Sequence, residues 1–488
     1  MRLIQPHEAA DSPDDLADRA FTVLDRRLTA HAGAPVAVAV SGGGDSVALL
    51  ALACDWAGAR ERPILALSVD HGLQAGSADW SRLAVETAQR LGAEARVLPW
   101  EGEKPATGLP AAARAARHRL LADAAREGGA GVILMAHTAD DLAETEAMRA
   151  DGSTLPDVRE WSPSPAWPEG RGVFLLRPLL GERRQALRAF LRARRLEWIE
   201  DPANADPKYA RSRARSQLQT LRHSGKRVGA GSAACPEPTW SALDAAEPRG
   251  EGGPGGFRIG GRTAPWSGMT ELWEGSREEG GALVVGRAGL RAAPPATARR
   301  FLAAALLCAA GTSRPPRGGR LDALLARLRS PEPVAATLAG AEIQALPDEI
   351  FVTREMPRGG LAPLEIAPRG VSVWDGRFEI EAGHTPLRIV AAAGLMARLG
   401  LADRKEILEL SPILRRSQPL NSPAAGTEGP ARPVLASASA KVRPLARSRL
   451  RAAVGLVQTE AEIASGRVAP EGRSSYVVAE RPPEAVAN

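Results

Sequence analysis

The sequence predicts an α/β fold. A doubly wound parallel sheet is expected first, followed by a mostly helical central region and a small α+β C-terminal region. Short apolar runs alternate with amphipathic segments over residues 35–176, which is typical of parallel strands joined by crossover helices. At 488 residues the chain is too long for one ordinary domain. We therefore expect three domains, over residues 1–215, 216–330 and 331–488.

The elements of the predicted sheet follow a helix that we expect over Asp14–Ala30. Five apolar runs are taken as strands: 35–40, 63–69, 95–100, 131–136 and 172–176. Helical patterns follow them near 45–58, 77–92, 109–128, 139–150 and 181–195. Ligands of such sheets bind beyond the carboxyl ends of the strands, so residues just after the runs are the functional candidates.

The second half of the chain has weaker patterns. Residues 223–282 are rich in Gly, Pro and Ser and are expected to form a linker or insertion. Residues 296–330 are expected to be helical, and 335–395 to mix short strands and turns. A second Pro- and Ser-rich break is expected at 416–436, ahead of a short ordered segment near 441–466.

Charge is distributed unevenly along the chain. Residues 1–170 contain 16 Lys and Arg against 25 Asp and Glu, a balance of −9. Residues 171–230 contain 15 against 5, a balance of +10. A compact basic segment suits a phosphate backbone, and a solvated Arg-rich helix face is the alternative.

Several classes of protein are excluded by composition. The start of the chain has no cationic segment followed by an apolar run, so we expect no signal peptide. No apolar stretch reaches the length of a membrane span. The cysteines, Cys54, Cys235 and Cys308, form no CxxC pair, which argues against a disulfide framework or a metal cluster. We expect a cytoplasmic protein with no membrane partner.

The strongest chemical signal is the string SGGGDS at residues 41–46, between a predicted strand and a predicted helix. Glycines let backbone N–H groups line a concavity, and a helix N-terminus adds positive potential. This predicts a phosphate cradle that is not a Walker A loop, because no Lys follows the glycines. Asp45 would repel phosphates without a divalent cation, so it implies Mg²⁺. The alternative is an ordinary capped turn.

The string AHTADDLAET at residues 136–145 also carries chemistry. If Thr138 opens a helix, then His137, Asp141 and Glu144 share one face near its N-terminus. Such a set suits nucleotide binding or substrate positioning. The alternative is a capping box between Thr138 and Asp141. Asp140 faces elsewhere and is the weaker candidate.

These strings resemble a known family. SGGGDS is similar to the PP-loop, SGGxDS, of the ATP pyrophosphatase superfamily, whose members cleave ATP between its α- and β-phosphates. Five further strings resemble those of tRNA(Ile)-lysidine synthetases in their order: SVDHGLQ (68–74), ARAARH (113–118), MAHTADDLAET (135–145), RPLL (177–180) and EDPANADPKYARSR (200–213). The resemblance implies a sheet of the PP-loop, adenine nucleotide alpha hydrolase-like type.

The resemblance also implies roles for individual residues. ATP would be held by Ser41, Gly42, Gly43, Gly44, Asp45, Ser46 and Arg114. The catalytic set would be Asp45, His137, Asp141 and Glu144, with Mg²⁺ at Asp45 and Asp141. Contacts to tRNA would come from Arg211 and Arg213. For each of these arginines a solvated helix face is the alternative.

The implied reaction joins lysine to C2 of the wobble cytidine in an isoleucine tRNA with a CAU anticodon. ATP first adenylates the cytidine, and AMP and diphosphate are released as the codon read changes from AUG to AUA. The implied partners are this tRNA and free L-lysine, and the oligomeric state, a homodimer among the options, is left open. The alternatives are a tRNA thiolase, an amidating synthetase of small molecules, or a catalytically inactive RNA-binding relative.

The sequence departs from the family's pattern in three places. Ser212 stands where the family commonly has Asn. After Thr145 the family usually continues to RGSG, whereas this chain has RADGST over 149–154, with Asp151 in the region of an expected Arg. The segment 161–170, WSPSPAWPEG, is expected to form a loop specific to a lineage.

Overall fold

The structure is a computed structural model that describes residues 13–74, 76–153, 157–200, 213–218, 267–316, 318–423, 430–434 and 440–464. Its described residues form two compact units. The first falls within Met1–Gly255 and Gln458–Arg467, and the second within Gly256–Val457. The expected division into three domains stays a prediction. In this described part of the chain, no helix is both long and apolar enough to cross a membrane.

The first unit is built on a six-stranded sheet. Its strands lie in the order β3 (Glu94–Pro99), β2 (Ile64–Asp70), β1 (Val36–Ala39), β4 (Val132–Leu134), β6 (Phe174–Leu176) and β5 (Trp161–Pro163). All neighbours are parallel except β5 and β6. The predicted parallel sheet is confirmed. The loop expected at 161–170 is wrong in part, because Trp161 stacks on Phe174 at 5.0 Å between ring centroids and draws β5 onto the sheet edge.

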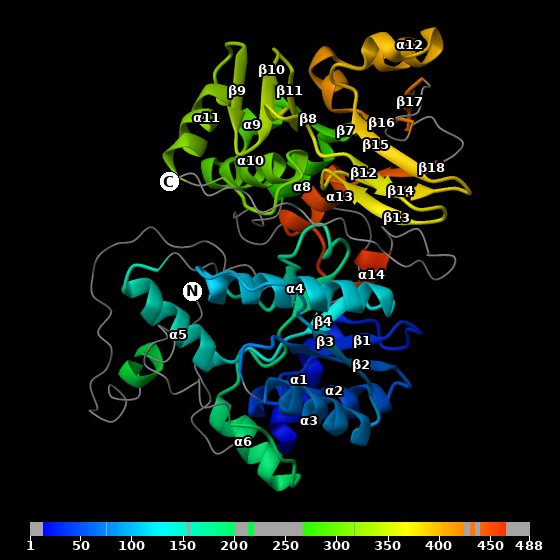
Figure 1. The fold of residues 1–488 in the computed structure, drawn as a ribbon. Coiled ribbons are helices and arrows are strands. Elements are labelled where there is room, and N and C mark those ends of the chain that lie inside the picture. The colour runs from blue at the N-terminus through cyan, green and yellow to red at the C-terminus, as the bar shows by residue number, and fades with distance from the viewer. Residues whose placement is uncertain are drawn as a thin grey trace. The chain divides into compact units, whose positions relative to one another are not determined.

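Helices cover both faces of this sheet. They are α1 (Pro13–Arg27), α2 (Gly44–Gly58), α3 (Ser77–Arg90), α4 (Leu109–Glu127), α5 (Ala139–Ala150) and α6 (Arg184–Ala193). Figure 1 shows α4 on one side of the sheet, with α2 and α3 on the other. Most residues of α2 are buried, because the helix is apolar on nearly every face. This burial fixes the start of α2 against the end of β1.

The strand order places one crevice at the centre of the sheet. From β1 the chain proceeds to β2 and β3 on one side, and then returns to β4 on the other side of β1. The segments that leave the carboxyl ends of β1 and β4 therefore diverge from a common point, where ligands of doubly wound sheets bind. The string SGGGDS follows β1, and the string AHTADDLAET follows β4.

A late segment of the chain belongs to this first unit. Glu460, at the start of α14 (Glu460–Ala464), accepts hydrogen bonds from both terminal nitrogens of Arg62, at 2.8 and 2.5 Å. The side chain of Arg62 is fully buried. Removing one partner of such a buried ion pair strongly lowers the stability of the fold. The ordered tail expected near 441–466 is thus divided, and its last part packs in the first unit.

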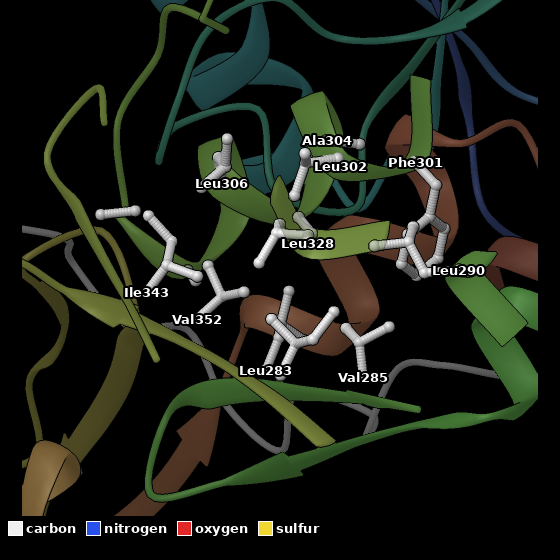
Figure 2. Packing of buried hydrophobic residues seen from close by; sticks show 14 of the residues in the cluster. Leu283, Val285, Leu290, Phe301, Leu302, Ala304, Leu306, Leu328, Ile343 and Val352 are labelled. Carbon is white, nitrogen blue, oxygen red and sulfur yellow. The ribbon is translucent and has the colours of Figure 1, made fainter. Parts of the chain in front are cut away.

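The second unit has a five-stranded antiparallel sheet, in the order β7 (Ser276–Glu279), β8 (Ala282–Gly286), β11 (Glu349–Arg354), β10 (Ala341–Ala345) and β9 (Val334–Leu338). The core beside it includes residues of α8 (Ser267–Glu274), α9 (Arg287–Ala292), α10 (Pro295–Ala309), α11 (Gly319–Arg329) and α13 (Ala446–Ala453). Figure 2 shows Leu283, Phe301 and Leu328 in this core. The linker expected at 223–282 is wrong for 267–282, because Met269 and Leu272 bury in the same core; 223–266 lies outside the described residues.

Two smaller antiparallel sheets complete the second unit. One holds β12 (Leu364–Ile366), β15 (Leu387–Ala391), β16 (Pro419–Asn421) and β17 (Arg432–Pro433). The other holds β13 (Val371–Trp374), β14 (Phe378–Ala382) and β18 (Ala440–Pro444). The helix α12 (Leu401–Glu409) and the 3-10 helices η2 (Met396–Arg398) and η3 (Pro412–Ser417) lie between strands in the chain. The break expected at 416–436 is wrong where β16 and β17 pair.

Candidate active site

The string SGGGDS forms a tight loop between β1 and α2. Gly42 has φ of +81°, a left-handed conformation that glycine adopts without strain, and α2 begins at Gly44. The hydroxyl of Ser46 donates to the carbonyl of Gly43 at 2.8 Å and accepts from the backbone N–H of Ser41 at 3.2 Å. The loop is thus braced from within, and the N-terminal end of α2 opens beside it. Such an end binds phosphate groups well.

A second segment supports the same loop from outside. The backbone N–H of Ile199 donates to the carbonyl of Gly42 at 2.9 Å, and Ile199 forms an isolated parallel bridge with Gly43. A Cβ atom on Gly42 would lie 2.6 Å from Cδ1 of Ile199, and one on Gly44 would lie 3.3 Å from Trp198. The glycines are therefore needed for close packing as well as for the turn. The sequence analysis did not assign this role to residues 198–199.

The start of α5 contains the predicted capping box. The backbone N–H and the hydroxyl of Thr138 both donate to Oδ2 of Asp141, at 2.8 Å each. The other oxygen of Asp141, Oδ1, accepts from Nη2 of Arg184 at 2.8 Å. One oxygen of Asp141 therefore caps the helix and the other is bound by Arg184, while its role in nucleotide binding or substrate positioning stays a prediction.

Three of the predicted acidic residues converge on Arg184, the first residue of α6. Its Nε donates to Asp45 at 3.0 Å, and its Nη1 donates to Glu144 at 2.5 Å. With the bond to Asp141, each carboxylate receives a different nitrogen of one guanidinium. Oε1 of Glu144 also accepts from Nε of Arg215 at 2.8 Å, although the Glu144 side chain is only 2% exposed. We call Asp45, Asp141 and Glu144 the acidic cluster.

Burial and neighbouring charges shift the pKa values of Asp45 and Arg184. Burial raises the pKa of Asp45, and the attraction of Arg184 offsets that effect only in part. Burial alone would lower the pKa of Arg184, but the hydrogen bond to Glu144 and the charges of the acidic cluster raise it above its ordinary value. The guanidinium therefore stays charged among its three partners.

His137 lies in a separate, basic group. Its Nδ1 accepts from Nε of Arg177 at 3.2 Å, which places the ring proton of the neutral form on Nε2. Burial lowers the pKa of Arg177 to about 10, with a further contribution from Arg114 and Arg117. Burial and the same arginines also lower the pKa of His118 to about 3, so this imidazole is neutral. The group offers positive charge beside the carboxyl ends of β4 and β6.

The remaining predicted residues are not members of the acidic cluster. Arg114 is exposed on α4 and acts on the basic group through its charge. Arg213 is exposed at the start of the helical stretch 213–218, and Arg211 lies outside the described residues. Asp140 accepts from the backbone N–H of Arg184, the first residue of α6, at 2.9 Å, and its lesser role in the site stays a prediction.

The arrangement of the acidic cluster does not fit a resident metal ion. One oxygen of each carboxylate accepts from a nitrogen of Arg184, so a guanidinium already occupies the point where the three carboxylates meet. Among the described residues, no three His, Cys, Asp or Glu side chains are arranged to hold a metal. The sequence predicts Mg²⁺ between these carboxylates and bound phosphates, and Mg²⁺ at Asp45 and Asp141 in the ATP-bound protein stays a prediction.

Arg184, Arg177 and Arg215 are functional candidates that the sequence analysis did not place in the site. Arg177 is the first residue of the string RPLL, which contributes to the family resemblance. No local pattern in the sequence predicts its contact with His137. Arg184 and Arg215 belong to the segment with a charge of +10, where they resemble the arginines of a solvated face. Only their contacts with the acidic cluster separate them from that face.

Comparison with known proteins identifies the family. Residues 19–221 match the PP-loop domain family. The tRNA(Ile)-lysidine synthase of Caulobacter vibrioides is 43% identical over 452 residues, which cover 91% of this chain and 98% of that protein. The chain belongs to the tRNA(Ile)-lysidine synthase family. The lysidine synthase of Hyphomonas neptunium is 39% identical over 343 residues, 68% of this chain and 85% of that protein.

A third relative extends the same result. The lysidine synthase of Mesorhizobium japonicum is 35% identical over 419 residues, which cover 81% of each chain. All the strings that resembled lysidine synthetases lie within the matched PP-loop domain, residues 19–221. The resemblance to this family and the predicted PP-loop fold are therefore confirmed, and the domain that carries the acidic cluster is an ATP-binding domain.

Proposed function

We propose that this member of the lysidine synthase family joins the ε-amine of free lysine to C2 of the wobble cytidine in an isoleucine tRNA with a CAU anticodon. As a family member it is a tRNA-modifying, ATP-dependent ligase that forms a carbon–nitrogen bond. We propose beyond family membership that the amine comes from free lysine and that the tRNA has a CAU anticodon. We also propose that the protein acts in the cytoplasm. The observation that supports it most is the acidic cluster beside the phosphate loop.

In the first step, O2 of the cytidine attacks the α-phosphorus of ATP and diphosphate leaves. The loop at 41–46 would hold the departing phosphates, because the N-terminal end of α2 presents backbone N–H groups to them. The hydrogen bonds of Ser46 and the packing of Ile199 keep this loop in shape before ATP binds. Such preorganised donors act without reorganising during the reaction.

In the second step, the lysine amine attacks C2, gives up a proton, and displaces AMP, which carries O2 away. An ammonium group approaching the site would be attracted by carboxylates, and Asp45 of the acidic cluster is itself part of the phosphate loop. The cluster's three carboxylates face one guanidinium from Arg184, and Glu144 also accepts from Arg215. The cluster therefore keeps a net negative charge that suits a cationic substrate.

The cysteines argue against the thiolase alternative. Burial and the charge of Asp55 raise the pKa of Cys54 to about 11. Burial likewise raises the pKa of Cys308 to about 12. Neither thiol supplies a thiolate at neutral pH, and the thiolate is the form that transfers sulfur. Cys235 lies outside the described residues.

The test is the attachment of radiolabelled lysine to a CAU isoleucine tRNA. Label should enter the RNA only when ATP is present, and arginine or ornithine should replace lysine poorly. Asp45→Asn and Asp141→Ala should abolish the transfer, while Glu146→Ala, an exposed position on the same α5 helix, should leave it unchanged. If ATP is consumed with this tRNA and labelled lysine never appears in the RNA, the proposed substrate is wrong.

A further inference from the structure

Arg184 is held in a defined position before any substrate binds. Its backbone N–H donates to Oδ2 of Asp140 at 2.9 Å, which fixes the start of α6 against α5. Its side chain is 19% exposed, and its three donor nitrogens each meet a different carboxylate at 2.5 to 3.0 Å. A guanidinium is planar and presents its donors as a rigid fork, so it can satisfy three acceptors in one plane.

The three carboxylates come from two different elements. Asp45 lies in the first turn of α2, whereas Asp141 and Glu144 lie on α5. Without a cation between them, like charges this close would repel one another and separate. Arg184 contacts all three carboxylates, so it joins the phosphate loop to α5.

We propose that Arg184 is a positioning residue that holds Asp45, Asp141 and Glu144 together as one cluster, and that its guanidinium, rather than a resident metal ion, offsets part of the cluster's negative charge before substrates arrive. The arginine acts through the carboxylates and through the phosphate loop that they adjoin. Its effect on lysine transfer rests on the proposed function, whereas its effect on metal binding does not.

The first test uses Mn²⁺ alone on the nucleotide-free protein, followed by electron paramagnetic resonance. The wild-type protein and Asp141→Asn should bind Mn²⁺ to the same extent, because the carboxylates of the wild type already have a cation. Stoichiometric Mn²⁺ binding that Asp141→Asn abolishes would overturn the proposal, since the cluster would then hold a metal in spite of Arg184.

The second test is a graded series at Arg184 in the lysine-transfer assay. Arg184→Gln should lower kcat by about 100-fold, the typical cost of misplaced reacting groups, with a smaller change in KM for lysine. Arg184→Lys should recover part of that loss, because it keeps the charge but not the fork. Arg194→Gln is the matched control: Arg194 directly follows α6 and pairs with Asp55 of α2, and its replacement should leave the wild-type kinetics unchanged.

The outcomes separate the proposals. A kcat of Arg184→Gln equal to that of the wild type, or a loss that Arg184→Lys does not relieve, would overturn the positioning role. A rise in KM for lysine at unchanged kcat would do the same, because it would make Arg184 a simple binding group. If the wild type attaches no lysine at all, the proposed function fails, and the Mn²⁺ measurement alone decides whether Arg184 is the cation of the cluster.

Discussion

Removal of the Glu144 carboxylate should destabilise the first unit by about 3 kcal/mol. Its side chain is 2% exposed and accepts from two guanidiniums. Glu144→Ala removes both charge-assisted hydrogen bonds, which are worth roughly 1.5–3 kcal/mol each. The loss of unfolding free energy is smaller than the sum of these values, because Arg184 remains paired with Asp45 and Asp141. Arg215 is 30% exposed and can be hydrated instead. Glu144→Gln keeps one acceptor and should cost roughly half as much.

The measurement should report on the first unit alone, since a chain with two units need not unfold in one step. Native-state hydrogen exchange of peptides from α2 and α5 does so. A loss of 3 kcal/mol corresponds to exchange that is roughly 150-fold faster. Glu146→Ala, which is exposed on the same helix, is the control. If Glu144→Ala and Glu146→Ala exchange within twofold of each other, the buried ion pairs do not contribute as reasoned.

Three further predictions concern other parts of the first unit. Gly42→Ala should destabilise the phosphate loop by about 2–4 kcal/mol and weaken ATP binding, because of the positive φ and the contact with Ile199. His118→Gln should flatten the pH dependence of stability. Below about pH 6.5 the imidazole binds a proton in the unfolded state, whereas in the folded state it does so only near pH 3. In the wild type the unfolding free energy therefore falls as pH falls through this window. Arg211→Ala with Arg213→Ala should reduce the salt slope of tRNA binding by about one to two units.

Each of these predictions has a matched control and a contrary result. Gly58→Ala, where an added Cβ meets nothing within 4 Å, should leave ATP binding unchanged, and Gly42→Ala fails as a prediction if it behaves likewise. His31→Gln, at an exposed position, should keep the wild-type pH dependence; an equal slope in His118→Gln would show that His118 titrates alike in both states. An unchanged salt slope would mean that Arg211 and Arg213 belong to a solvated face.

Local patterns along the sequence predict the fold class and the chemistry of the two loops. Periodicity is a local property, so the alternation of apolar runs and helices in the first unit was predicted with nearly the observed bounds. The string SGGGDS needed only its own backbone to indicate a phosphate cradle. The face shared by His137, Asp141 and Glu144 followed from helix geometry, and so did the capping box of Thr138.

Which groups meet these residues depends on how the chain folds in three dimensions. Arg184 lies 139 residues from Asp45 and 40 from Glu144, and Arg215 lies 71 from Glu144. No local pattern separates such arginines from those of a solvated face, because the difference lies in what the fold brings opposite them. The same holds for Ile199 against Gly42 and for Glu460 in the first unit. Long-range pairing depends on the order of the strands, and the sequence does not state that order.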